Sequence, residues 1–191
     1  MKIVVVVDMQ NDFIDGVLGT PEAQAIVPVM IERLKEFNDG ETLLFFTKDT
    51  HSADYLETQE GKNLPVPHCI KGTSGWYINE EISNYVDSGS SFLTYLTSDI
   101  HSNRILKPTF GSIKLAEVIK EFINKVAKVD EIILMGVCTD ICVVSNALLL
   151  KAYCPETLIT VDASCCAGVT PESHTAALTT MKMCQINVIN D

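Results

Sequence analysis

The sequence predicts an α/β fold, a single three-layer domain over residues 1–191 with a mostly parallel six-stranded sheet and helices on both faces. Short apolar runs rich in β-branched residues alternate along the chain with segments of helical periodicity. These runs are continuously apolar instead of alternating with polar residues, as expected of strands covered on both faces. A length of 191 residues suits one domain with one hydrophobic core.

The candidate strands share this continuous apolar character. They are Ile3–Val7, Thr42–Phe46, Arg104–Leu106, Glu131–Met135, Thr157–Val161 and Ile186–Ile189. The first run is too short for a signal peptide or a membrane span, so we interpret it as a buried strand.

The candidate helices lie between these strands. Apolar residues recur at helical spacing in Val27–Asn38, Ser112–Val126, Thr139–Ala152 and Pro171–Met183. Pro28 is tolerable in a first turn, and Ser112 is a candidate N-cap. The long loop at about residues 50–76 (Thr50–Trp76) shows no clear periodicity, and long loops inside compact domains are usually functional.

Charge and cysteine content narrow the class of protein. The net charge is −11, and no basic block is present, which argues against nucleic acid or an anionic membrane as the partner. A small-molecule partner fits better. Seven cysteines form an odd set in a chain without an export signal, so we expect reduced thiols in the cytoplasm and not a disulfide framework.

Four chemically active residues follow the ends of predicted strands. They are Asp8, Asp49, Lys107 and Cys142. Ligands of open α/β sheets bind beyond the carboxyl ends of the strands, so a carboxylate, a cation and a thiol can meet there. A helix start can lower the pKa of the Cys142 thiol, whereas a buried structural cysteine is the plainer alternative. Asp8 as a turn cap and Lys107 as a surface lysine are the corresponding alternatives.

A second cluster lies in the long loop. Asp49, His51, Glu60 and His68 offer carboxylate and imidazole ligands, which suit zinc, iron or manganese better than calcium. Solvent-exposed loop histidines are the alternative. The other two histidines, His101 and His174, have no partner in the sequence, and we expect structural roles for them. Thr139 and Asp140 are expected to cap the helix that follows.

Three segments resemble the signatures of the isochorismatase-like cysteine hydrolases. They are Val7–Phe13, Lys107–Ser112 and Gly136–Val143, in matching order and spacing. Within that superfamily, Asp49–His51 together with Leu64–Cys69 resembles the metal site of nicotinamidases. The resemblance extends from Ile3 to about Ile189 and implies the isochorismatase-like fold, with a Rossmann-like strand order.

The resemblance also implies the roles of individual residues. Asp8, Lys107 and Cys142 would form the catalytic triad, and the backbone N–H groups of Cys138 and Cys142 the oxyanion hole. Asp49, His51 and His68 would hold one divalent metal ion, zinc in the first instance with iron or manganese as alternatives, and Glu60 is a further candidate ligand. Phe13 and Trp76 are candidate ring contacts, with packing in the core as the alternative for both, and the resemblance favours Phe13 over Trp76. A cis peptide is expected at Val137–Cys138, and a homo-oligomer is expected from family habit.

The implied activity is hydrolysis of nicotinamide to nicotinic acid and ammonia through a cysteine thioester. Two alternatives remain: a related amidase acting on a carbamoyl or ureido substrate, and a non-catalytic family member that binds a ligand or a partner subunit. A redox couple of Cys138 and Cys142 fits less well, because their spacing differs from that of Cys-x-x-Cys oxidoreductases.

Overall fold

One six-stranded sheet organises the residues that the computed structural model describes, which are 1–37, 40–86 and 103–191. Its strands are β1 (Lys2–Val7), β2 (Thr42–Asp49), β3 (Arg104–Lys107), β4 (Glu131–Val137), β5 (Leu158–Ala167) and β6 (Asn187–Ile189). Their order is β3-β2-β1-β4-β5-β6, and every neighbouring pair is parallel. The predicted six-stranded sheet with Rossmann-like order is therefore confirmed.

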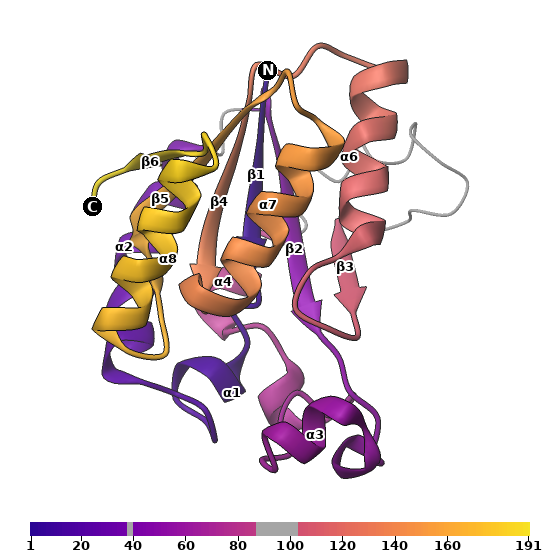
Figure 1. Ribbon diagram of the computed structural model, residues 1–191, viewed down its shortest axis with the longest axis vertical. Coiled ribbons are helices and arrows are strands. Elements are labelled where there is room, and N and C mark those ends of the chain that lie inside the picture. Colours follow the sequence, from indigo (N-terminus) through magenta and orange to yellow (C-terminus); the bar gives the residue numbers. More distant parts are fainter. Residues whose placement is uncertain (38–39, 87–102) are drawn as a thin grey trace.

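Helices cover both faces of the sheet (Figure 1). The helices are α1 (Asn11–Ile14), α2 (Pro21–Glu36), α3 (Gln59–Asn63), α4 (Glu80–Ser83), α6 (Ile113–Lys125), α7 (Val144–Tyr153) and α8 (Pro171–Met183). The last three lie side by side over one face, and α2 and α4 cover the other. No helix among the described residues has the length and apolarity needed to cross a membrane.

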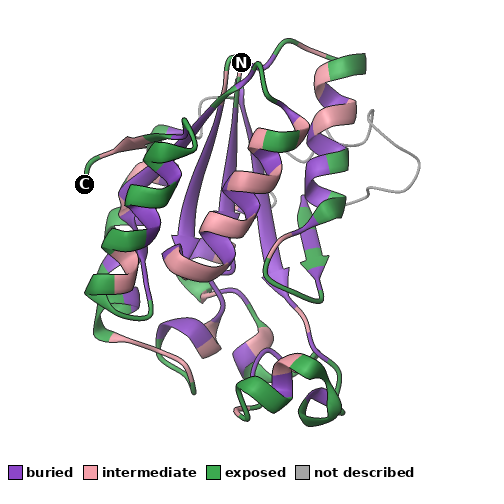
Figure 2. Ribbon diagram, viewed as in Figure 1, coloured by how far each residue is buried: buried purple, intermediate pink, exposed green. Residues whose placement is uncertain are grey.

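The central strands explain why the apolar runs are continuous. Residues 3–7 of β1 are almost fully buried, and the central strands are buried along their length (Figure 2). A strand between two helical layers has no solvent-facing side, so both sets of alternating side chains are apolar. Burial of this apolar surface is the main stabilising contribution to the fold.

Helix α2 differs from the prediction at its start. It begins at Pro21 and not at Val27, because the Thr20 side chain accepts a hydrogen bond from the Ala23 N–H and caps the first turn. Pro28 consequently lies inside the helix. The predicted end at Asn38 lies outside the described residues.

Strand β5 extends to Ala167, well beyond the predicted end at Val161. The strand can continue because the carboxylate of the next residue, Asp162, is paired with a cation. Asp162 is fully buried, and its Oδ2 lies 3.0 Å from Nε of Arg33 in α2. Its Oδ1 accepts hydrogen bonds from Ser164 and Asn190. These partners let a carboxylate occupy a strand interior and tie α2 to β5.

The long loop at 50–76 contains short regular elements that its periodicity did not reveal. They are two 3₁₀ turns, η1 (Tyr55–Glu57) and η2 (Ser74–Trp76), with α3 between them. The Thr58 side chain caps α3 by accepting a hydrogen bond from the Gly61 N–H. Single turns of this length are too short to show a helical hydrophobic pattern.

The Arg33–Asp162 pair gives a stability prediction. Asp162→Asn removes the charge facing Arg33 but keeps a side-chain oxygen, so the free energy of unfolding should fall by about 1–3 kcal/mol in urea denaturation at pH 7. The control Glu32→Gln removes an exposed partner of Lys35 and should change stability by less than about 0.5 kcal/mol. Wild-type stability of Asp162→Asn would show that the pair does not anchor α2.

Candidate active site and metal centre

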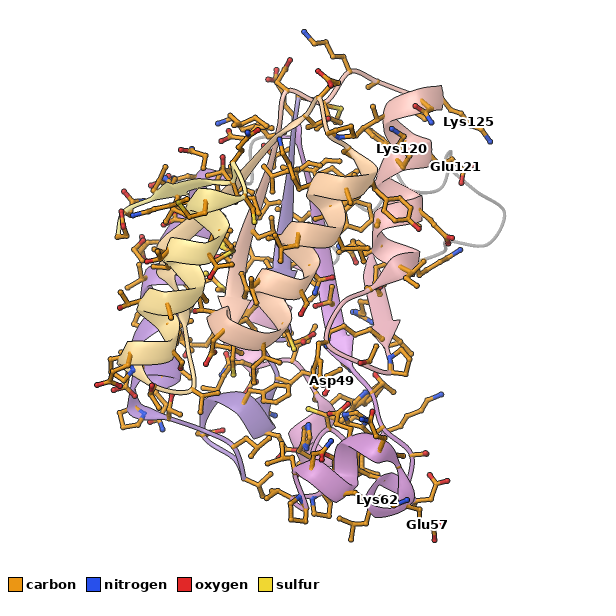
Figure 3. The ribbon with its side chains drawn as sticks, in the orientation of Figure 1. Asp49, Glu57, Lys62, Lys120, Glu121 and Lys125 are labelled. Carbon is orange, nitrogen blue, oxygen red and sulfur yellow. The ribbon has the colours of Figure 1, made fainter. Side chains whose placement is uncertain are left out.

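The predicted site residues meet at the carboxyl end of the sheet. Asp49, the last residue of β2, lies next to the part of the long loop that contains α3 (Figure 3). Glu57 and Lys62 lie on the side of that loop away from the sheet. The β2–β3 register sets Asp49 opposite Lys107 on the neighbouring strand. Parallel pairing thus brings together two residues that are far apart in the sequence.

Asp8 follows β1 in a left-handed backbone conformation, with φ of 49°. Its carboxyl group is fully buried, and Oδ1 accepts a 2.7 Å hydrogen bond from the Thr47 hydroxyl. Oδ2 has no hydrogen bond of good geometry within the described chain and lies 2.6 Å from the Lys107 ammonium. Burial raises the pKa of Asp8 above its usual value, against the opposing effect of Lys107.

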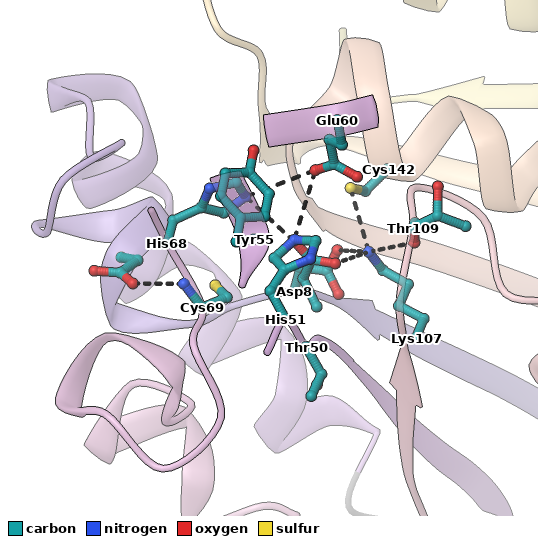
Figure 4. Close-up of polar contacts among 12 residues, drawn as sticks. Asp8, Thr50, His51, Tyr55, Glu60, His68, Cys69, Lys107, Thr109 and Cys142 are labelled. Carbon is teal, nitrogen blue, oxygen red and sulfur yellow. Dashed lines mark hydrogen bonds and ion pairs between the residues drawn. The ribbon is translucent and has the colours of Figure 1, made fainter. Parts of the chain in front are cut away.

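Lys107 is the centre of the buried charge cluster (Figure 4). Besides Asp8, its Nζ lies 3.3 Å from Oδ1 of Asp49, 3.0 Å from the Thr109 carbonyl oxygen and 3.5 Å from Sγ of Cys142. Burial lowers the pKa of Lys107, but the neighbouring anionic groups, Asp8 foremost, outweigh burial and raise it. The side chain therefore remains a cation although it is buried.

Cys142 is a buried thiol in the π-helical turn η3 (Thr139–Val143) that precedes α7. Burial raises its pKa well above the usual value and the Asp8 carboxylate adds to the shift, while Lys107 opposes it. The expectation that the helix start lowers this pKa is therefore wrong. Burial thus favours the protonated form of the thiol, which lies beside the buried Asp8–Lys107 pair.

The start of this helical region also differs from the prediction. Cys138 occupies the N-cap position, and the expected cis peptide at Val137–Cys138 is present. Thr139 does not cap the helix, because its hydroxyl is hydrogen-bonded to Nδ1 of His174 at 2.8 Å. The Asp140 carboxylate instead accepts from the N–H of Val169. His174 thus joins α8 to this turn, whereas His101 lies outside the described residues.

The four predicted metal ligands form a cluster. One ligand atom from each of Asp49, His51, Glu60 and His68 lies within 4.8 Å of all the others. Nε2 of His51 is 2.9 Å from Oδ2 of Asp49 and 3.5 Å from Oε1 of Glu60. Two imidazole nitrogens and two carboxylate oxygens form a donor set that suits zinc, iron or manganese.

The histidines of this cluster are oriented by neighbouring groups. Nδ1–H of His68 donates to the Val66 carbonyl at 2.8 Å, which leaves Nε2 facing the cluster. Such a hydrogen bond fixes the tautomer and ring direction of a ligating histidine. Tyr55 packs against the His51 and His68 rings, with centroids 4.7 and 5.0 Å away. The residues present therefore fit a divalent metal ion.

A cavity of about 270 Å³ joins the cluster to the thiol. It is lined by Asp49, Glu60 and His68 from the cluster and by Cys138 and Cys142 from η3 and its N-cap, and the remaining wall is apolar apart from Thr20. Phe13 lines the cavity and packs edge-on against His68, with ring centroids 5.5 Å apart. Sequence analysis did not assign Leu18, Leu64, Phe110 and Val169 to the wall, which they help to form, because isolated apolar residues carry no signal for a pocket.

Trp76 does not line this cavity, contrary to the prediction. Its ring lies 3.1 Å from the Lys48 ammonium, and its indole N–H donates to the Thr50 hydroxyl. It borders another cavity, of about 850 Å³, whose wall contains none of the triad or metal-cluster residues. The larger cavity is therefore not the site of the predicted chemistry.

A family model of the isochorismatase domain matches residues 2–190. The chain belongs to the isochorismatase family. The family assignment agrees with the three sequence segments and with the cysteine-based cluster at the sheet edge. Members of this family that resemble the chain over its full length include nicotinamidases, which are amide hydrolases. The chain is therefore an enzyme of the hydrolase class.

Individual members of the isochorismatase family are similar over the full length. The chain is 26% identical to the nicotinamidase of Schizosaccharomyces pombe, over 98% of this chain and 92% of the relative. A pyrazinamidase/nicotinamidase structure from Streptococcus mutans is 27% identical, with a TM-score of 0.74 over 99% and 100% of the two chains. A Pyrococcus horikoshii pyrazinamidase in complex with zinc shares the fold at 21% identity, with a TM-score of 0.73 over 100% and 99%.

The buried ammonium gives a second prediction. Lys107→Met leaves the carboxylates of Asp8 and Asp49 without their shared counter-charge, so chelator-treated protein should lose about 3–5 kcal/mol of unfolding free energy in urea. Adding Asp8→Asn removes one uncompensated charge and should recover part of that loss. Strictly additive losses in the double variant would contradict the coupling.

Proposed function

We propose that this isochorismatase-family enzyme is a nicotinamidase that hydrolyses nicotinamide to nicotinic acid and ammonia. One observation carries the proposal: a single cavity is lined both by Cys142 and by three residues of the metal-ligand cluster, Asp49, Glu60 and His68. A pyridine carboxamide has the matching polarity, with an amide and a ring nitrogen separated by a flat apolar ring. The named relatives support the same substrate.

The Cys142 sulfur is the nucleophile of the proposed mechanism. Its proton passes to Asp8 as sulfur attacks the amide carbon, and Lys107 stabilises the negative charge shared by the two groups. The tetrahedral intermediate collapses when the C–N bond breaks, and Asp8 returns the proton to the leaving ammonia. Water then attacks the thioester, so nicotinic acid forms and the Cys142 thiol is restored.

The tetrahedral oxyanion requires hydrogen-bond donors at the carbonyl end of the cavity. We assign the backbone N–H groups of Cys138 and Cys142 to this role, because both residues line the cavity at the thiol. Donors held in place before reaction stabilise the developing charge without reorganisation. The side chain of Cys138 takes no part in this scheme.

Asp49, His51, Glu60 and His68 would hold one divalent ion, with zinc as the proposed metal. When bound, the ion would supply a Lewis-acidic contact for the ring nitrogen of the substrate. Phe13 and the apolar wall would contact the ring and hold it in one orientation. Holding the amide over the sulfur in this way contributes through orientation.

The lining of the cavity favours nicotinamide over the carbamoyl alternative. No lysine or arginine lines it among the described residues, so a carbamoyl amino acid would bring its carboxylate beside acidic groups without a matching cation. A non-catalytic role fits less well, because burying a lysine, a carboxylate and a thiol together carries a desolvation penalty that ligand binding alone does not require.

We also propose that the enzyme acts in the cytoplasm as a homo-oligomer. Seven free cysteines, most of them buried, suit a reducing compartment. Exposed apolar side chains such as Leu106, Phe110 and Ile113 offer surface for contact between subunits.

The nucleophile is tested by substitution. Cys142→Ala should lower kcat for ammonia release from nicotinamide by at least about a thousandfold, because no other group forms the thioester. Cys154→Ala is the matched control, since Cys154 is also buried but lies at the end of α7, away from the cavity. Near wild-type turnover by Cys142→Ala would remove Cys142 as the nucleophile.

The metal and the substrate are tested together by ammonia release. Chelator-treated enzyme should lose activity on nicotinamide, and added zinc should restore it. Benzamide, which lacks the ring nitrogen, should react at least about tenfold more slowly in kcat/KM. Full activity without metal, or preference for an N-carbamoyl amino acid, would overturn the nicotinamidase assignment.

A further inference from the structure

The segment Gln10–Asp12 forms the N-cap and the first two residues of α1. It contacts the backbone of two segments that carry metal ligands. It contributes no atom to the ligand cluster itself. Its polar side chains instead reach β2 and the long loop, which are distant in sequence. These contacts fix the backbone at or next to metal ligands, so their role depends on the metal centre of the proposed function.

The Gln10 side chain forms hydrogen bonds with both the N–H and the carbonyl group of Asp49. This side chain is fully buried, Oε1 accepts from the Asp49 N–H at 2.7 Å, and Nε2 donates to the Asp49 carbonyl at 2.9 Å. Nε2 also donates to the Trp76 carbonyl at 2.9 Å. One carboxamide thus fixes the peptide groups on either side of the Asp49 Cα, and with them the direction of its carboxylate.

Asp12 holds the residue that follows His68. Its Oδ2 accepts a 2.7 Å hydrogen bond from the N–H of Cys69, which adopts a left-handed conformation with φ of 46°. A non-glycine residue keeps such a conformation only where its surroundings impose it. The Cys69 carbonyl in turn accepts from the His51 N–H at 3.0 Å, so the backbone at both histidines is tied to the Asp12 carboxylate.

The Asp12 carboxylate has little freedom to move. A Cβ atom placed on Gly75 would overlap this carboxylate, so the loop backbone passes directly against it. Asn11 makes a comparable link from the same segment, because its Nδ2 donates to the Ser74 carbonyl at 2.9 Å. That link, however, reaches none of the residues that carry or adjoin a metal ligand.

We propose that Gln10 and Asp12 are positioning residues of the metal centre, which set its geometry by holding the backbone of Asp49 and Cys69 directly and that of His51 through Cys69. Neither ligates the ion nor touches the reacting atoms. Outer contacts of this kind typically change metal affinity by about 10- to 100-fold when they are removed. The consequence is that metal affinity depends on residues outside the ligand set.

The test measures zinc affinity in full-length protein by competition with a chromophoric chelator. Gln10→Ala and Asp12→Ala should each weaken zinc binding by about 10- to 100-fold. Asp12→Asn retains an oxygen that can accept from the Cys69 N–H, so its loss should be smaller than that of Asp12→Ala. Circular dichroism and thermal unfolding of the metal-free proteins check that each variant is folded.

Two controls separate positioning from general loss of stability. Asn11→Ala removes a loop contact of the same segment and should bind zinc within about twofold of wild type. Asp162→Asn weakens the fold at the Arg33 pair, three strands away from β2, and should also leave zinc affinity unchanged. A merely structural role for Gln10 and Asp12 would make affinity follow thermal stability across all these variants.

The outcomes distinguish this inference from the proposed function. Wild-type zinc affinity in folded Gln10→Ala and Asp12→Ala overturns the inference, as does an equal loss in the two controls. A wild-type protein that binds no zinc, iron or manganese overturns both the metal centre and its positioning residues. Weakened zinc binding in an enzyme that does not hydrolyse nicotinamide overturns the proposed substrate alone.

Discussion

The Lys107 ammonium is buried between three groups that would otherwise be incompatible in one place. Asp8 and Asp49 are both carboxylates, and Cys142 becomes anionic when it loses its proton. Two carboxylates this close in a buried site repel each other unless a cation lies between them. The same cation therefore stabilises the fold at the sheet edge and the charge that moves during catalysis. It also couples the thiol end of the site to the metal-ligand end, because Asp49 belongs to both.

The parallel sheet supplies this arrangement. β1, β2, β3 and β4 end at one edge, and each delivers one group there or leads into one: Asp8, Asp49, Lys107 and Cys142. The long loop then folds back over the edge, adds His51, Glu60 and His68 to the metal-ligand cluster, and lines the cavity with Glu60 and His68. Hydrogen bonds between the loop and the start of α1, from Gln10, Asn11 and Asp12, hold it in this position. The loop is thus part of the site because its backbone is tied to the sheet.

Sequence reasoning succeeded where the signal was local. Continuous apolar runs predicted the strands, and polar residues at their ends predicted which side chains meet. It failed where a distant partner decides the outcome. Arg33 allows Asp162 to lie inside β5, His174 engages Thr139 and so leaves the turn uncapped, and Lys48 with Thr50 holds Trp76 away from the substrate cavity. None of these partners is close in sequence.

The sequence by itself determined the fold class, and its family resemblance determined the strand order. It also determined the set of residues that gather at the sheet edge. Hydrophobic pattern and motif spacing, on which these predictions depend, are properties of the chain alone. Only the tertiary structure decided the direction in which the pKa of Cys142 shifts and the walls of the cavity. The pKa of a buried thiol depends on desolvation and on charges brought in from other strands. The shape of a cavity depends likewise on which apolar side chains packing leaves facing one another.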